Sequence, residues 1–179
     1  MNIKQFTIEN IPFIGLLLLM VLVAMINENF LTVDNLLNIF RQTSINAIIA
    51  MGMTFVILTA GIDLSSGSIL AFAGAVCATL IAADVPLIIA LPGTLVLGAA
   101  LGATSGSIIA YFGVQAFIAT LVAMTMVRGG VLVFTGGRPI STGNYDVANT
   151  FYEVGGGYIG GIPIPVIITG VVFLLCWYV

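Results

Sequence analysis

Charged residues and histidine are scarce in this chain of 179 residues. It has no histidine, four lysine or arginine residues and seven aspartate or glutamate residues, so that charged residues make up 6% of the chain against 60% hydrophobic residues. A soluble domain carries about 25% charged residues, so this composition could not cover a surface in water. A net charge of −3 on so few groups offers no basic patch for nucleic acid. The composition therefore indicates an integral membrane protein.

The missing residue types also exclude several kinds of chemistry. Without histidine, and with Cys77 and Cys176 isolated in apolar runs, neither a zinc site, a histidine-assisted nucleophile nor a disulfide is supported. The chain contains no Gly-x-x-x-x-Gly-Lys-Ser/Thr sequence, the P-loop that binds ATP. No acidic residue lies in the middle of a predicted span, as a proton relay would require. We expect no catalytic residue, cofactor or metal in this chain, and any ATP hydrolysis in a separate subunit.

The charge-free runs predict the membrane architecture, because a charge at the bilayer centre costs about 2.5 to 3.5 kcal/mol. A hydrocarbon core about 30 Å thick needs roughly 20 helical residues. The run 85–127 is about twice that length and must turn back, most readily at 111–115. The glycine-rich, polar segment 136–161 is predicted to be a loop. We predict an all-α polytopic bundle, one transmembrane domain over 1–179, with about six spans at 11–27, 42–62, 64–83, 86–111, 115–135 and 162–179.

Small residues form a regular pattern in the fourth predicted span. Gly98, Gly102 and Gly106 repeat every four residues. Such a face lets helix backbones approach closely, so the pattern predicts helix packing there. A helix that slides during gating is the functional alternative.

Polar residues interrupt two apolar runs over residues 59–68, which read TAGIDLSSGS. In one interpretation Asp63 or Ser65 caps the next helix by accepting hydrogen bonds from its free N–H groups. In the other, this is a broken-helix junction whose backbone groups and hydroxyls face a polar pathway. The two interpretations are compatible.

Two further features have mainly architectural interpretations. Arg128 lies within the fifth predicted span, where snorkelling to the headgroup region is the simpler interpretation. A gate, or a tie to Asp63 or Asp146, is the alternative. Thr32 before an apolar segment predicts an N-cap and a helical lead into the second span.

Six segments of the sequence match those of a known family: 35–39, 42–48, 51–68, 114–121, 128–129 and 163–166. They resemble the ribose-type permease subunits of bacterial sugar ABC importers, in the branched-chain amino acid/sugar permease family. The resemblance covers nearly the whole chain, and residues 61–68 are its most specific part. Ser66 stands where the family usually has valine. Family members are far longer, and a basic cytoplasmic segment after the sixth span engages their ATPase, so we expect an N-terminal part that does not transport alone.

The resemblance implies a multi-pass permease of the bacterial inner membrane. It would pair with a second permease copy, receive a monosaccharide, ribose being favoured, from a periplasmic binding protein, and be driven through alternating access by an ATP-binding subunit. An ATP-independent secondary transporter or channel and a nonfunctional truncated fragment are the alternatives. The resemblance implies that the junction at 63–68 and residues 115–117 lie near the pathway. The hydroxyl side chains near the junction suit a polyol such as a sugar. The candidate pathway or gate residues are Thr59, Asp63, Ser65, Ser66, Gln115 and Phe117.

Overall fold

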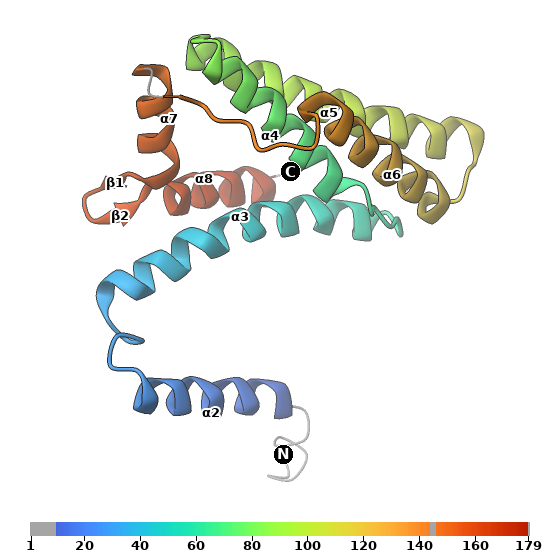
Figure 1. Cartoon of the computed structure of the whole chain (residues 1–179). Helices are drawn as coiled ribbons and strands as arrows, with labels where there is room; N and C mark the ends of the chain where they lie inside the picture. Colours follow the sequence, from blue (N-terminus) through green and yellow to red (C-terminus); the bar gives the residue numbers. More distant parts are fainter. Residues whose placement is uncertain (1–9, 144–145, 179) are drawn as a thin grey trace. The chain divides into compact units, whose positions relative to one another are not determined.

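The computed structural model describes residues 10–143 and 146–178, and this part of the chain is mostly helical (Figure 1). The all-α class predicted from the sequence is confirmed. Val179, the last residue of the sixth predicted span, lies outside the described residues. The elements are α2 (Ile11–Ile26), α3 (Val33–Leu58), α4 (Ser66–Ala82), α5 (Leu87–Phe112), α6 (Ala116–Thr135), α7 (Asp146–Gly156), β1 (Tyr158–Ile159), β2 (Ile162–Pro163) and α8 (Ile164–Tyr178).

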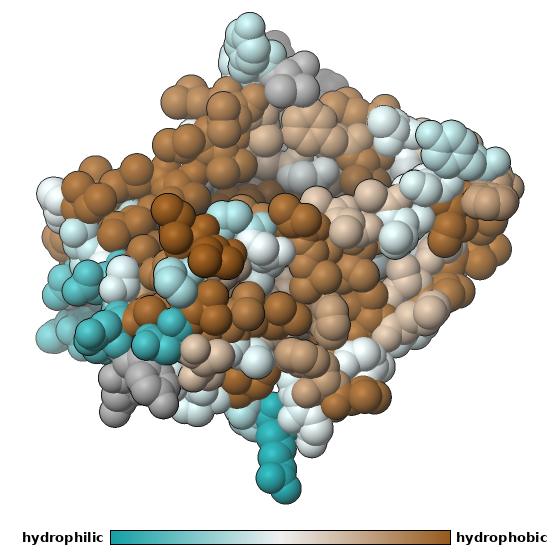
Figure 2. All heavy atoms as spheres, turned by 90° about the horizontal axis from the view of Figure 1, so that it is seen from above, coloured by the Kyte–Doolittle hydropathy of each residue, from teal (hydrophilic) through white to brown (hydrophobic). Residues whose placement is uncertain are grey.

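Six of these helices are apolar, and each of the six predicted spans overlaps one of them. Helices α3, α5 and α6 are long and apolar enough to cross a membrane, whereas α2, α4 and α8 are shorter. Large apolar side chains cover much of the outer surface, and brown dominates the face seen in Figure 2. Such a surface suits a hydrocarbon environment, because a soluble protein rarely exposes apolar patches of this extent.

The chain divides into two compact units, Met1–Thr43 and Ser44–Val179, and the division falls within α3. In the described part of the first unit, α2 carries a proline in its first turn, where the missing N–H is tolerated. The start of α3 is capped as its sequence predicts, because the Asn35 backbone N–H donates to Thr32 Oγ1 at 3.4 Å. The Asn35 side-chain amide donates to the Phe30 carbonyl at 2.7 Å.

In the second unit, α4 packs against both α5 and α6 (Figure 1). Helix α4 is rich in alanine and glycine, so neighbouring backbones can come close to it. The rings of Phe72 in α4 and Phe134 in α6 meet edge to face, with centroids 5.8 Å apart. A small core is formed where Cys77 and Ile81 of α4 meet Ala148 of α7.

Helix α7 and the short hairpin differ from the loop predicted over 136–161. Ala148 is fully buried, and Val147 and Phe151 pack against the same core, so an amphipathic pattern supports this helix. Its glycines come only at the C-terminal end, where they interrupt no helical turn. Gly160 and Gly161, with φ of 60° and 82°, form the tight turn between β1 and β2 that glycine favours.

The turn between α5 and α6 lies within segment 111–115. Gly113 ends α5 with φ of 64°, the left-handed conformation that glycine adopts without a Cβ clash. Helix α6 then starts at Ala116, and the two helices run back along each other beside α4 (Figure 1). This hairpin and the α3–α4 junction are the two parts of the fold that shape the candidate site.

Candidate functional site

The α3–α4 junction is a stretch of seven non-helical residues, 59–65, between two apolar helices. Helix α3 ends in a Schellman arrangement, in which the Gly61 N–H donates to the Val56 carbonyl and the Ala60 N–H to the Ile57 carbonyl, both at 2.9 Å. Ala60 takes the left-handed conformation, with φ of 56°, which an alanine adopts only at a cost. A Cβ at Gly61 would lie 3.1 Å from the Val56 carbonyl oxygen, so the chain turns tightly here.

Asp63 holds the second half of this junction in place. Its Oδ1 accepts a hydrogen bond from the Ser65 backbone N–H at 2.7 Å and another from the Ser65 hydroxyl at 2.6 Å. Ser65 is the N-cap residue of α4 but makes no capping bond with its side chain. The predicted capping is therefore wrong in its detail. The carboxylate fixes the turn that precedes the helix, and the Ser65 hydroxyl is used for that turn and not for the helix N–H groups.

Thr120 of α6 contacts the junction from the side. Its Oγ1 lies 3.2 Å from the Ile62 carbonyl and 2.8 Å from the Ala116 carbonyl of its own helix, so the single hydroxyl proton is shared between them. The residue is 2% exposed. Sequence reasoning missed it, since a lone threonine in an apolar helix has no distinguishing pattern and usually bonds only to its own backbone.

A cavity of about 380 Å³ lies between the junction, α5 and α6. This volume is within the range of roughly 300 to 1,000 Å³ that is usual for small-molecule sites. Most of the wall is apolar, with a few polar groups facing inward. The residues that line this cavity include Thr59, Asp63, Ser65, Gly102, Ser105 and Thr120.

A second cavity, of about 460 Å³, lies between α3, α4 and α5. Its wall includes Ser66 and Thr94. Val56, Asp63 and Gly102 border both cavities, so these three residues separate them. Asp63 is therefore the one carboxylate, among the described residues, that lines both spaces.

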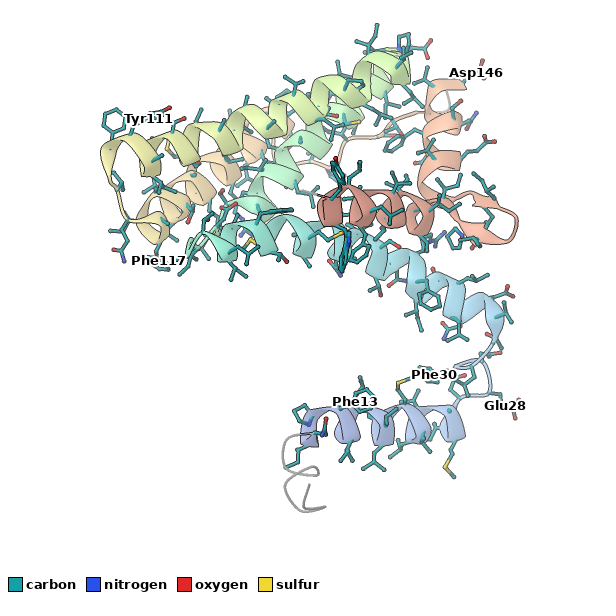
Figure 3. All side chains as sticks on the ribbon, turned by 180° about the vertical axis from the view of Figure 1, so that it is seen from behind. Phe13, Glu28, Phe30, Tyr111, Phe117 and Asp146 are labelled. Carbon is teal, nitrogen blue, oxygen red and sulfur yellow. The ribbon has the colours of Figure 1, made fainter. Side chains whose placement is uncertain are left out.

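The candidate pathway residues are only partly brought together. Thr59, Asp63 and Ser65 border the first cavity and Ser66 borders the second. Gln115 and Phe117 border neither of the two, although Ala116 between them borders the first. Phe117 is 45% exposed and lies at the same end of the α5–α6 hairpin as Tyr111 (Figure 3).

The glycine pattern of α5 approaches another described helix at one of its three positions. A Cβ at Gly98 would lie 3.8 Å from Ile69 Cγ2, which is ordinary contact. At Gly102 and Gly106 a Cβ would have no neighbour within 4 Å, and both residues border the first cavity. The missing side chains therefore leave open space in the described structure, where the sequence pattern predicts a helix–helix contact.

Arg128 lies on α6 with its side chain exposed, beside Gly67 and Ser68. Within the described residues Arg128 forms no ion pair, so the alternative interpretation of a tie to Asp63 or Asp146 is not observed. The described residues also contain no cluster of three or more histidine, cysteine, aspartate or glutamate side chains that could hold a metal. The chemistry available at the junction is hydrogen bonding by hydroxyls, one carboxylate and backbone carbonyls.

Comparisons with known proteins cover most of the chain. The family model described as branched-chain amino acid transport system / permease component matches residues 35–179. The ribose import permease protein of Haemophilus influenzae is 53% identical over 99% of this chain and 55% of its own length. Its counterpart in Escherichia coli K12 is 49% identical over 98% of this chain and 54% of its own length. The D-allose transport system permease protein of that strain is 40% identical over 84% of this chain and 45% of its own length. The chain thus spans about half the length of the curated relatives it matches. No solved structure matches it.

Proposed function

The chain belongs to the branched-chain amino acid transport system / permease component family, and on that premise we propose that it is the membrane-spanning permease part of an ATP-driven importer for a monosaccharide, ribose being favoured. The observation that carries this proposal is the 53% identity to a ribose import permease over 99% of the chain. Relatives named for D-allose and xylose are less similar, at 40% and 38%. The similarity thus favours a sugar, with ribose first.

In this proposal the chain provides the route for the sugar and takes no part in ATP hydrolysis. A separate ATP-binding subunit drives alternating access, a second permease copy completes the membrane part, and a periplasmic protein delivers the sugar. The assembly lies in the bacterial inner membrane, surrounded by lipid. The absence of a P-loop sequence and of histidine from this chain agrees with that division of labour.

The α3–α4 junction supports a role for this region in the route. Non-helical backbone is tolerated at membrane depth only where protein surrounds it or where it lines a cavity, because its polar groups need partners. Here the junction borders a cavity that also receives the Asp63 carboxylate. Carboxylates and hydroxyls bind neutral sugars through the sugar hydroxyls without requiring a counter-ion. We propose that Thr59, Asp63, Ser65 and Ser66 lie on the route, with Gln115 and Phe117 near a gate at the end of the α5–α6 hairpin.

The test is uptake of labelled ribose by bacteria that carry or lack the gene for the protein containing this chain. We expect uptake to be lost in the deletion strain and restored by the gene, to stop when cellular ATP is depleted, and to persist when the proton gradient alone is collapsed. Labelled leucine serves as the control substrate, because the family's description also names amino acids. Ribose uptake that follows the ion gradient would instead support a secondary transporter. Leucine uptake without ribose uptake would contradict the sugar assignment.

A further inference from the structure

Ser105 is an unusual hydroxyl in α5, and sequence reasoning did not single it out. It is 8% exposed and borders the first cavity, yet its hydroxyl forms no hydrogen bond with another described residue. Threonines in the same helix bond back to their own backbone. Thr104 Oγ1 donates to the Leu101 carbonyl at 2.7 Å, and Thr94 Oγ1 donates to the Ala90 carbonyl at 3.0 Å. A polar group buried in protein normally has such a partner, so the Ser105 hydroxyl has bonding capacity left for another molecule.

The accessible part of Ser105 includes its hydroxyl oxygen. Among the described residues, no fully buried side-chain oxygen or nitrogen lacks a hydrogen-bond partner. The unbonded Oγ of Ser105 must therefore retain accessible surface, although the residue as a whole is nearly buried. Ser105 lies between Gly102 and Gly106 on the face of α5 that borders the first cavity, and neither glycine has a side chain to cover it.

Ser105 also borders a smaller space of about 230 Å³ between α5 and α6. The walls of that space are apolar except for Thr104, whose hydroxyl already bonds to Leu101. The first cavity, by contrast, contains Asp63, of which only Oδ1 is engaged by Ser65. No described residue is bonded to the second carboxylate oxygen, Oδ2. Ser105 and Asp63, each with an oxygen that bonds to no described residue, thus both line the first cavity.

We propose that the Ser105 hydroxyl and Asp63 Oδ2 form a binding subsite for a neutral polyhydroxylated molecule in the first cavity. This inference rests on the proposed function, since the ligand would be the transported monosaccharide. The carboxylate oxygen accepts a hydrogen bond from one sugar hydroxyl, and Ser105 donates to or accepts from another. Apolar residues such as Val56 and Ile109 provide walls for the C–H faces of the sugar ring. An anionic ligand is disfavoured, because the cavity lining has a carboxylate and no cationic side chain.

The first test uses thiol labelling in the assembled importer in membrane vesicles, after replacement of every native cysteine of the permease, Cys77 and Cys176 included. Ser105→Cys is compared with Ser107→Cys, the same change two residues along α5 at an exposed position outside the first cavity. A small water-soluble thiol reagent should modify the cysteine at position 105, and saturating ribose should slow that reaction at least fivefold. At position 107, ribose should leave the rate unchanged.

The second test measures ribose uptake by Ser105→Ala and Ser107→Ala. Loss of one neutral hydrogen bond should raise the half-saturating ribose concentration of Ser105→Ala roughly 2- to 12-fold, with Ser107→Ala unchanged. The melting temperature of Ser105→Ala should equal that of the wild type, because the hydroxyl has no partner in the protein. A structural role would lower the melting temperature and leave the half-saturating concentration as it was.

The outcomes separate the two proposals. The subsite alone would be overturned if the wild-type importer takes up ribose but the cysteine at position 105 is unreactive or is not protected by ribose, and Ser105→Ala takes up ribose normally. An unreactive cysteine would mean that another protein segment fills the cavity. Absence of ribose uptake by the wild-type importer would contradict the proposed function and, with it, the sugar subsite.

Discussion

Replacing Asp63 with alanine should destabilise the α3–α4 junction, because one carboxylate oxygen accepts both hydrogen bonds from Ser65. A hydrogen bond to an ionised group contributes about 1.5 to 3 kcal/mol. Asp63 is half-buried and both bonds end on one residue, so we expect a total loss of about 2 to 4 kcal/mol. At roughly 2 to 4 °C per kcal/mol for a chain of this size, the melting temperature should fall by about 5 to 15 °C.

Two conservative variants divide this effect between its parts. Asp63→Asn keeps an oxygen acceptor without the charge. Its loss of stability should be about half that of Asp63→Ala, because neutral hydrogen bonds are about half as strong as those to a charged group. Ser65→Ala removes the hydroxyl bond of 2.6 Å and leaves the backbone N–H bond of 2.7 Å in place. The melting temperature of Ser65→Ala should therefore also lie between those of the wild type and Asp63→Ala.

The assay is the fraction of monodisperse permease that remains on size-exclusion chromatography after heating in detergent, with ribose uptake measured in parallel. We expect Asp63→Ala to impair assembly or uptake. Glu28→Ala is the charge control, because Glu28 is exposed and its side chain bonds to no described residue. A melting temperature for Asp63→Ala within 1 °C of the wild type, or an equal fall for Glu28→Ala, would refute the reasoning.

Two further predictions concern the walls of the first cavity. Thr120→Val keeps the shape of the side chain but removes the hydrogen bond to the Ile62 carbonyl, and should lower stability by about 1 kcal/mol. Thr125→Val, whose hydroxyl bonds only within α6, is its control, and equal melting temperatures for the two variants would contradict the link between α6 and the junction. Gly102→Leu should fill space between the two cavities and reduce ribose uptake at least tenfold without lowering the melting temperature, because a Cβ there has no neighbour within 4 Å. Gly93→Leu, elsewhere on α5, should retain uptake, and equal uptake by both variants would argue against a route past Gly102.

Much of the helical framework could be predicted from the sequence, because long apolar runs between charges leave few other structures in lipid. Helix α7 was missed for a physical reason. Its amphipathic pattern is short and lies among glycines and polar residues, so its helical character depends on Ala148 packing against Cys77 and Ile81, a contact between distant segments.

The candidate site was predicted in part. Asp63 and its neighbouring hydroxyls stood out because polar groups interrupt an apolar run, and the structure places Thr59, Asp63 and Ser65 around one cavity. Ser105 and Thr120 lie in apolar helices that carry other hydroxyl residues, and what distinguishes them is their burial and hydrogen bonding, which the sequence does not show. The roles of all these residues in transport, and those of Gln115 and Phe117, stay predictions.

The hydrogen bond between Thr120 and the Ile62 carbonyl has a consequence for biosynthesis. Its two partners are 58 residues apart in the chain. At about 5 to 20 residues per second, a ribosome needs roughly 3 to 12 s to make the intervening segment. During that interval the Ile62 carbonyl has no bond to Thr120, because Thr120 has not yet been synthesised. The Asp63–Ser65 bonds join residues two positions apart and can form as soon as Ser65 is made. The Asp63 carboxylate can therefore order the nascent junction first, and the hydrogen bond from α6 is added only after α6 has been synthesised.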